Sequence, residues 1–300
     1  MPEIKSKFFG AQEESSAEPP TSILYFGAFG CRKSTIAATI SRYFPVLPQQ
    51  LPLPTRVELK DLLYLSWDRQ ATLGFPKLGI SAPSFNLSTI KPREILDAFA
   101  DLHMMVEERV KSGKTEIIIH DTWGAMDNKA MAYCSLTFDV GGKVSSESSQ
   151  MLYRQSLAIQ QQEFQFYTSL QTPTGKPVVN IFLCHAKFAT DPPTKDPAQI
   201  NKHRTAFLNK GIDLEGGGKT IARITGQAWE FMHQQCALVM YMDTRFANSK
   251  TVSTFYPTGG KGSVSRDRGG VLSAEEIADF RVILPKYNAT PNAAPTGGSK

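Results

Sequence analysis

The feature that most constrains the fold is a glycine-rich turn near the amino terminus, within the stretch YFGAFGCRKSTIAA. The apolar segment SILYF leads into it, and a helical pattern from Ser34 to Tyr43 follows it. Two glycines, a lysine and a hydroxyl residue have the spacing of a loop that wraps around phosphate oxygens: Gly27, Gly30, Lys33 and Ser34. The amino end of the following helix adds N–H groups that favour an anion. The sequence therefore predicts a phosphate-binding loop between a strand and a helix.

One residue departs from that pattern, because Arg32 stands before Lys33 where a second glycine is expected. A side chain there either obstructs the phosphate or needs a backbone conformation that glycine adopts more easily. Arginine is accommodated if its guanidinium points outward or itself binds phosphate. We expect nucleotide binding to persist, through the residues Gly27, Gly30, Cys31, Arg32, Lys33, Ser34 and Thr35. The alternative is a glycine-rich turn with an incidental lysine.

The composition is that of a soluble globular protein, with 41% hydrophobic and 20% charged residues in a chain of 300. The net charge of +5 permits an anionic partner but does not indicate one. The four cysteines are far apart, so they suggest neither a zinc site nor a disulfide framework. The sequence contains no membrane-length apolar run and no signal peptide. We therefore expect a cytoplasmic protein with reduced thiols.

Strand-like and helix-like segments alternate along the chain. The expected strands are SILYF, LLYLSW, TEIIIHD, PVVNIFLCH and CALVMYM, and STFYP and FRVIL are candidates for late antiparallel strands. The expected helices are Ser34 to Tyr43, Pro92 to Lys111, Met151 to Leu170 and Ala222 to Gln235. Strands separated by helices predict one α/β domain with a central, mainly parallel sheet flanked by helices.

Polar, proline-rich segments bound this domain. Residues 1–20 and 288–300 are expected to be disordered, which leaves residues 21–287 for the folded domain. Three stretches have no clear element: Leu47 to Arg56, Asp139 to Ser149 and Asp191 to Thr220. Loops of that length in a compact domain are usually functional or disordered.

Two aspartates lie at the ends of predicted strands and are candidates for metal binding and for catalysis beside a phosphate. Asp121 ends TEIIIHD, in the position of a carboxylate that holds Mg²⁺ together with Ser34. Asp68 follows LLYLSW and would orient an attacking water if its strand ends at the same sheet edge. The alternatives are an aspartate that caps a turn at residue 121 and a surface ion pair at residue 68.

A histidine and a basic loop complete the candidates. His185 ends the strand PVVNIFLCH and would sense the terminal phosphate, or else simply form a hydrogen bond at the strand end. The late segment GGKGSVSRDRGG carries Lys261, Arg266 and Arg268. Basic residues on such a loop can reach a neighbouring subunit's phosphates, although a solvated loop explains them equally well.

With these residues in order, the chain resembles the RecA-like P-loop ATPases, especially small phage-encoded members related to single-strand-annealing recombination proteins. The resemblance spans about Thr21 to Lys286, and its specific motifs are the phosphate loop and the strand that ends on Asp121. It implies that Lys33 and Ser34 bind the phosphates and Mg²⁺ of ATP. It further implies that Asp68 activates water, where glutamate is commoner. His185 falls on the phosphate-sensing position.

The resemblance also implies partners. Such ATPases assemble into homo-oligomers and bind single-stranded DNA through loops beside the sheet. Between Lys187 and Arg223, seven lysine or arginine residues outnumber four acidic ones. Such a loop suits contacts with DNA phosphates that do not depend on the base sequence. A solvated insertion would have the same composition.

Three functions remain open from the sequence. The first is a Mg²⁺-dependent ATPase that acts on DNA in recombination, repair or replication. The second is a binding or scaffold module in which Arg32 impairs hydrolysis. The third is a kinase that transfers phosphate to a small molecule.

Overall fold

The structure is a computed structural model that describes residues 20–40, 57–58, 61–68, 80–137, 146–209, 212–214, 218–247 and 250–288. The main sheet contains β1 (Ser22–Gly27), β3 (Leu62–Ser66), β5 (Ser84–Asn86), β6 (Ile117–Asp121), β7 (Val179–Ala189), β8 (Lys219–Ala222), β9 (Leu238–Ala247), β10 (Lys250–Tyr256), β11 (Arg266–Asp267) and β12 (Glu276–Ile277). A separate pair is formed by β2 (Val57–Glu58) and β4 (Ile80–Ser81).

Seven α-helices and three short 3₁₀ turns accompany the strands in the described part of the chain. The helices are α1 (Lys33–Ala37), α2 (Ile95–Lys111), α3 (Trp123–Thr137), α4 (Ser146–Ser169), α5 (Pro197–Leu208), α6 (Gly226–Gln235) and α7 (Phe280–Asn288). The 3₁₀ turns are η1 (Ala38–Ile40), η3 (Pro92–Glu94) and η4 (Gly260–Gly262). In the described ranges, no helix combines the length and the apolar character needed to cross a bilayer.

The expected α/β class is confirmed by the sheet. Its order is β12-β10-β9-β1-β7-β6-β3-β5, and the neighbours from β9 to β5 pair in parallel. The strands β8, β10, β11 and β12 are antiparallel additions. After β1 the chain continues to β3 and β5, and it returns through β6 and β7, so that β7 pairs with one side of β1. The chain then crosses to β9, which pairs with the other side of β1. Ligands bind outside the carboxyl ends of strands at such a switch in direction.

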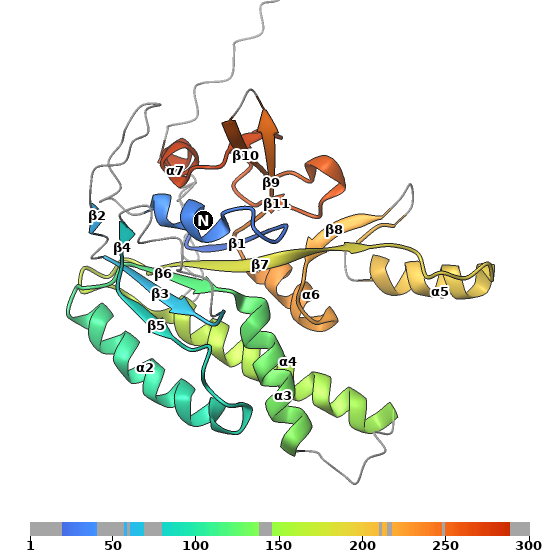
Figure 1. Cartoon of the computed structure of the whole chain (residues 1–300), viewed down its shortest axis with the longest axis horizontal. Helices are drawn as coiled ribbons and strands as arrows, with labels where there is room; N and C mark the ends of the chain where they lie inside the picture. Colours follow the sequence, from blue (N-terminus) through green and yellow to red (C-terminus); the bar gives the residue numbers. More distant parts are fainter. Residues whose placement is uncertain are drawn as a thin grey trace, which may run out of the picture.

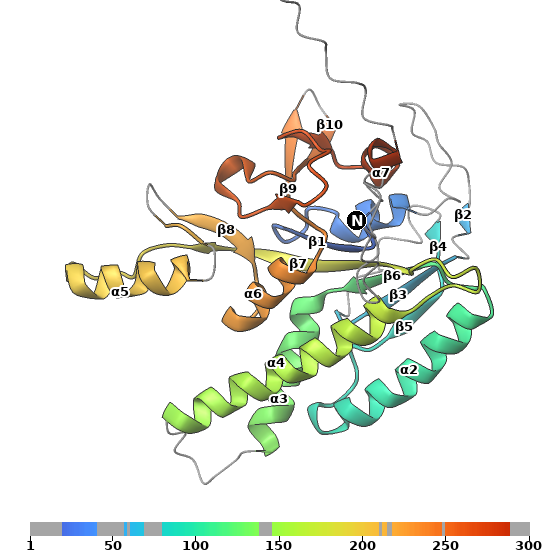
Figure 2. The same ribbon diagram turned by 180° about the vertical axis from the view of Figure 1, so that it is seen from behind.

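Helices cover both faces of the sheet, as Figure 1 and the reverse view in Figure 2 show. Leu24 and Phe26 face the core under α2, α3, α4 and α6. Ile23 and Tyr25 face a second core under α1 and α7. Burial on both faces explains why the central strands are nearly continuous apolar runs rather than alternating ones.

Some expected elements differ from the observed ones. FRVIL is the start of helix α7 rather than a strand, because Phe280, Ile283 and Tyr287 form one buried helical face. Helix α6 begins at Gly226, because residues up to Ala222 form strand β8. The strand expected at STFYP is β10 and is antiparallel to β9.

Two helices lie where the sequence analysis expected none. Helix α3 buries Trp123, Met126, Ala130 and Cys134 at helical spacing, a pattern that its small residues obscure. Helix α5 lies inside the unassigned stretch from Asp191, and α4 includes the end of the stretch from Asp139. The segment Leu47 to Arg56 and the expected tails, except residues 20 and 288, lie outside the described residues.

An arm extends from the sheet at the end of β7. We define it as residues 186–209 together with β8: the last residues of β7 pair with β8, and α5 lies beyond them. Figure 1 and Figure 2 place α5 at the far end of β7, away from α2 and α3. No residue of α5 is buried, although Asp196 caps its first turn by accepting a hydrogen bond from the Ala198 N–H at 2.9 Å.

Candidate nucleotide site

The phosphate loop follows β1 directly and lies at the carboxyl edge of the sheet. A Cβ atom on Gly27 would lie 2.6 Å from the Met242 carbonyl oxygen, so only glycine allows β1 and β9 to approach this closely. Gly30 has φ of 76°, the left-handed conformation that glycine adopts without strain. Both predicted glycines therefore have a backbone reason to be glycine.

Lys33 lies inside its own loop. Its side chain is buried, and Nζ donates hydrogen bonds to the carbonyl oxygens of Ala28 at 2.8 Å and Gly27 at 3.2 Å. The same ammonium lies 3.4 Å from Nδ1 of His185 and 3.7 Å from Sγ of Cys31. Burial raises the pKa of the Cys31 thiol, so the thiol is neutral. These partners carry no negative charge, and phosphate oxygens would be stronger acceptors for the ammonium.

Ser34 and Asp121 come together although 87 positions separate them, because Ser34 Oγ donates a hydrogen bond to Asp121 Oδ2. The Asp121 side chain is buried, and burial raises its pKa to about 6, while the Ser34 hydrogen bond and the Lys33 charge act in the opposite direction. Asp68 follows the neighbouring strand, and its N–H donates to the Asp121 carbonyl oxygen at 3.3 Å. The structure thus brings together the two acids that the sequence nominated.

Ser34 and Asp121 together fit a magnesium ion. The described residues contain no cluster of three or more His, Cys, Asp or Glu side chains arranged around a metal position. Magnesium does not need one, because it keeps several waters and takes one or two carboxylates plus phosphate oxygens. A serine hydroxyl and one buried carboxylate at a helix amino terminus match that requirement.

His185 lies opposite Gly27 in the pairing of β7 with β1. Burial, followed by the charge of Lys33, lowers the pKa of His185, so the imidazole is neutral near pH 7. The ring stacks on Phe29, with centroids 5.1 Å apart, and the Phe29 side chain is 75% exposed. The histidine predicted to sense a phosphate therefore contacts the lysine of the phosphate loop.

Arg32 has the conformation expected of a glycine. Its φ is 65° and its ψ is 27°, it precedes α1 without a capping side-chain hydrogen bond, and its side chain is exposed. A left-handed conformation costs a non-glycine residue about 1–2 kcal/mol. The guanidinium points outward, so the strain lies in the backbone and the side chain does not fill the loop.

The Arg32→Gly variant is therefore expected to be more stable by up to about 1 kcal/mol, since glycine relieves the strain but loses some entropy on folding. Urea unfolding of the nucleotide-free protein measures this. Arg32→Ala is the matched control, because it removes the charge and keeps the Cβ atom. A gain of the same size in both variants would assign the effect to charge rather than to backbone strain.

Two buried tyrosines that sequence analysis missed support the loop from below. Tyr25 on β1 donates its hydroxyl hydrogen bond to the Lys33 carbonyl, and Tyr64 on β3 donates to the Ser34 carbonyl. Both phenols thus fix the first turn of α1, whose free N–H groups are the ones expected to bind a phosphate. In the sequence, both residues read as ordinary apolar strand positions.

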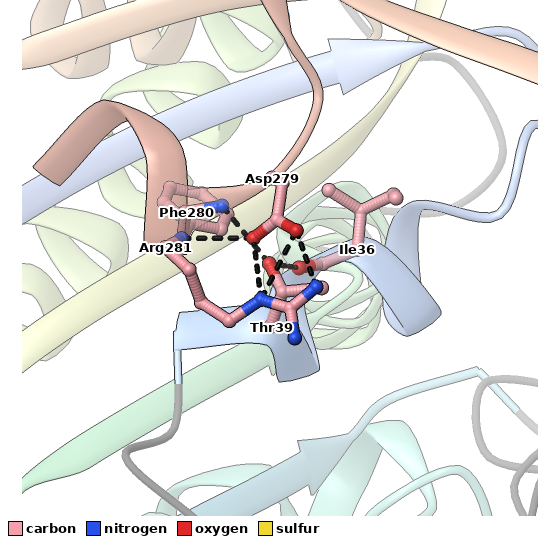
Figure 3. A network of polar contacts seen from close by, with 5 residues as sticks. All are labelled: Ile36, Thr39, Asp279, Phe280 and Arg281. Atoms are coloured by element: carbon pink, nitrogen blue, oxygen red, sulfur yellow. Dashed lines mark hydrogen bonds and ion pairs between the residues drawn. The ribbon is translucent and has the colours of Figure 1, made fainter. Parts of the chain in front are cut away.

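Helix α7 supports the same segment from the other side, as Figure 3 shows. Thr39 Oγ1 accepts a hydrogen bond from the Phe280 N–H at 2.9 Å and donates one to the Ile36 carbonyl at 2.7 Å. Asp279 and Arg281 form an ion pair beside this contact. The carboxyl-terminal helix therefore holds the turn that follows the phosphate loop.

The three predicted finger residues lie in different places. Lys261 binds Asp243, the residue of β9 that follows Met242, which pairs with Gly27. The neighbouring Thr244 Oγ1 donates a hydrogen bond to the Cys31 carbonyl at 3.2 Å. Arg266 and Arg268 donate to carbonyl oxygens at the carboxyl end of α6, where positive charge is favoured. That end lies near the amino ends of the strands, so neither arginine contacts a nucleotide in its own loop.

Comparison with known proteins identifies structural likenesses of low similarity. No family model matches the chain, and no curated protein matches it. The flagellar accessory protein FlaH from Methanocaldococcus jannaschii is 9% identical, with a TM-score of 0.32, over 86% of this chain and 84% of that one. The KaiC-like protein PH0186 from Pyrococcus horikoshii is 9% identical, with a TM-score of 0.31, over 79% and 78%.

Proposed function

We propose that this protein is an ATP-binding, Mg²⁺-dependent ATPase of RecA-like type that acts on DNA as a homo-oligomer in recombination, repair or replication, in a phage. The observation that carries the ATPase proposal is the meeting of Lys33, Ser34 and Asp121 at one sheet edge. Asp68 and His185 lie at the same edge, beside Asp121 and Lys33 respectively. The phage and oligomer parts rest on the sequence resemblance.

Each residue has a role that follows from its position. Lys33 leaves its two carbonyl partners to neutralise the β- and γ-phosphates. Ser34 and Asp121 would hold Mg²⁺, which screens the phosphate charge when bound. Asp68 orients the attacking water, and the neutral His185 donates or accepts one hydrogen bond near the terminal phosphate.

The arm is the surface that we assign to DNA. It carries five lysine or arginine residues against two acids, Asp191 and Asp196. Of the other charged residues between Lys187 and Arg223, Lys210 and Glu215 lie outside the described residues, and Asp213 and Arg223 lie outside the arm. Lys195 and Lys202 are exposed, while Arg204 is paired with Asp191. Phe188 is 65% exposed on the same arm and offers an aromatic face to a base.

ATP hydrolysis by the purified protein with Mg²⁺, with and without single-stranded DNA, tests both parts. We expect turnover that DNA stimulates and that Lys33→Ala abolishes. In Lys195→Glu/Lys202→Glu, DNA affinity should fall and its dependence on salt should become shallower, because fewer counterions are released. Turnover without DNA should stay unchanged in that double variant.

Lys91→Glu is the control for the charge change, because Lys91 is an exposed lysine before α2 and outside the arm. Equal loss of DNA affinity in Lys91→Glu would show that the arm has no special role. Turnover that DNA never stimulates, in protein that hydrolyses ATP, would contradict the DNA assignment and leave the ATPase intact.

A second candidate is a nucleotide-binding module that does not turn over, and the strained Arg32 favours it. In that case, the wild-type protein binds ATP without hydrolysing it, and Arg32→Gly restores turnover. Single-turnover assays on the two proteins separate this function from the ATPase.

A further inference from the structure

The basic residues that follow the central strands differ in whether they have partners. Lys261 is paired with Asp243, and Arg266 and Arg268 bind carbonyl oxygens of α6. The Arg223 side chain is exposed, and within the described ranges its guanidinium has no hydrogen bond or ion pair. Arg223 is therefore a long cation that is free to bind an anion.

Strand pairing places Arg223 beside the site. In the β7–β8 register Ala186 faces Ala222, and the next pair is closed by a 2.6 Å hydrogen bond from the Arg223 N–H to the His185 carbonyl. Residues that face each other across antiparallel strands project side chains on the same face. Arg223 therefore projects beside His185, whose ring lies 3.4 Å from the Lys33 ammonium.

The backbone at Arg223 is held firmly. A Cβ atom on Gly124, in the first turn of α3, would lie 2.7 Å from the Arg223 carbonyl oxygen. On the following residues, Lys187 Nζ donates to the Ile224 carbonyl at 2.8 Å, and the Thr225 N–H donates to Asp127 Oδ2 at 2.9 Å. A free guanidinium on a fixed backbone can bind a ligand at one defined position.

We propose that Arg223 binds the terminal phosphate of the nucleotide held in the loop of its own chain, an inference that rests on the proposed ATP-binding function. The planar guanidinium can donate two parallel hydrogen bonds to phosphate oxygens, which a lysine cannot do. The positive charge of Arg223 already acts at this place, because it contributes to the lowered pKa of His185, after the larger effects of burial and Lys33.

This contact distinguishes a triphosphate from a diphosphate. Lys33 serves both nucleotides through the β-phosphate, whereas Arg223 would find its partner only when the γ-phosphate is present. Arg223 therefore makes the site selective for ATP over ADP. A cation that merely lies in solvent, or that contacts DNA phosphates on the arm, would not discriminate between the two nucleotides.

The test measures binding of a non-hydrolysable ATP analogue and of ADP to the full-length protein without DNA. In Arg223→Ala, we expect affinity for the analogue to fall about 10- to 100-fold, as loss of a charge-assisted hydrogen bond predicts, and affinity for ADP to change less than about twofold. Arg223→Lys should lose part of the discrimination. Arg154→Ala, at an exposed arginine of α4, is the matched control and should resemble wild type.

The outcomes separate this inference from the function on which it rests. A wild-type protein that binds neither nucleotide refutes the ATP-binding function. A wild-type protein that binds both, with the analogue-to-ADP affinity ratio unchanged in Arg223→Ala, overturns the role of Arg223 alone. Equal loss of both affinities in that variant also overturns it, because the effect would then be structural.

Discussion

Lys33→Ala is expected to lower affinity for ATP and ADP by at least about 100-fold, since the variant loses the charge-assisted contacts to the phosphates. The fold should survive this change. In the nucleotide-free protein, Lys33 is buried and bonded to carbonyl oxygens rather than to a carboxylate, so alanine leaves no acid unpaired among these partners. Isothermal titration of nucleotide, with circular dichroism and thermal unfolding of the same samples, measures both effects.

Lys91→Ala is the matched control, because its side chain is 78% exposed in its ion pair with Glu94. It should bind nucleotide as wild type does. If Lys33→Ala kept wild-type affinity, the assignment of the loop would be wrong. If it unfolded, Lys33→Met would test the same contacts while it preserves the packing of the aliphatic chain.

Asp121→Asn is expected to act in opposite directions on stability and activity. Burial raises the pKa of Asp121 from the usual 3.8 to about 6, so the ionised carboxylate is disfavoured in the folded, metal-free protein. Its contribution to stability is fully present below about pH 4 and is lost as the pH rises through about 6. Asparagine has no such loss and can still accept the Ser34 hydrogen bond.

At pH 7.5, the variant should therefore be more stable than wild type by about 2–3 kcal/mol, and below pH 4 the two should converge. Its Mg²⁺-dependent turnover should fall by about 100-fold or more, because the neutral amide is a poor ligand for a hard cation. Urea unfolding at several pH values and steady-state ATP hydrolysis measure these effects.

Asp101→Asn is the control, since Asp101 is an exposed aspartate of α2. It should change neither stability nor turnover appreciably. A destabilised Asp121→Asn protein at pH 7.5 would contradict the burial argument, whereas an active one would contradict the metal role. The two assignments can thus fail independently.

The sequence predicted the central sheet because its strands are unusually apolar. The segments that contain Ile23, Leu63 and Ile118 are buried on both faces, so each reads as a strand without any knowledge of its neighbours. Helix α3 was missed because alanine, glycine and serine dilute its buried stripe, and FRVIL was misassigned because a short apolar run suits a strand and a helix alike.

The convergence of Lys33, Asp68, Asp121 and His185 was also predictable, because parallel strands deliver their carboxyl ends to one edge. The contacts that surround these residues were not predictable. The contact of Tyr64 with the Ser34 carbonyl depends on which strand lies under α1. The position of Arg223 depends on strand β8, which the sequence did not predict, and Arg223 itself was expected in a helix that began at Ala222. Such contacts are set by strand order, which local pattern does not contain.

The strand order also determines when the domain can fold during its synthesis on the ribosome. Strand β1 is synthesised before the other strands, yet its two neighbours, β7 and β9, lie more than 150 residues later. Thr39 accepts a hydrogen bond from Phe280, which lies near the end of the described chain. A nascent chain that stops before β7 contains neither of the strands that pair with β1, the strand that leads into the phosphate loop. Pairings of such long sequence separation form slowly, because their loop closure precedes any gain from contact. If the protein binds ATP as we propose, almost the whole domain must therefore leave the ribosome before the nucleotide can bind.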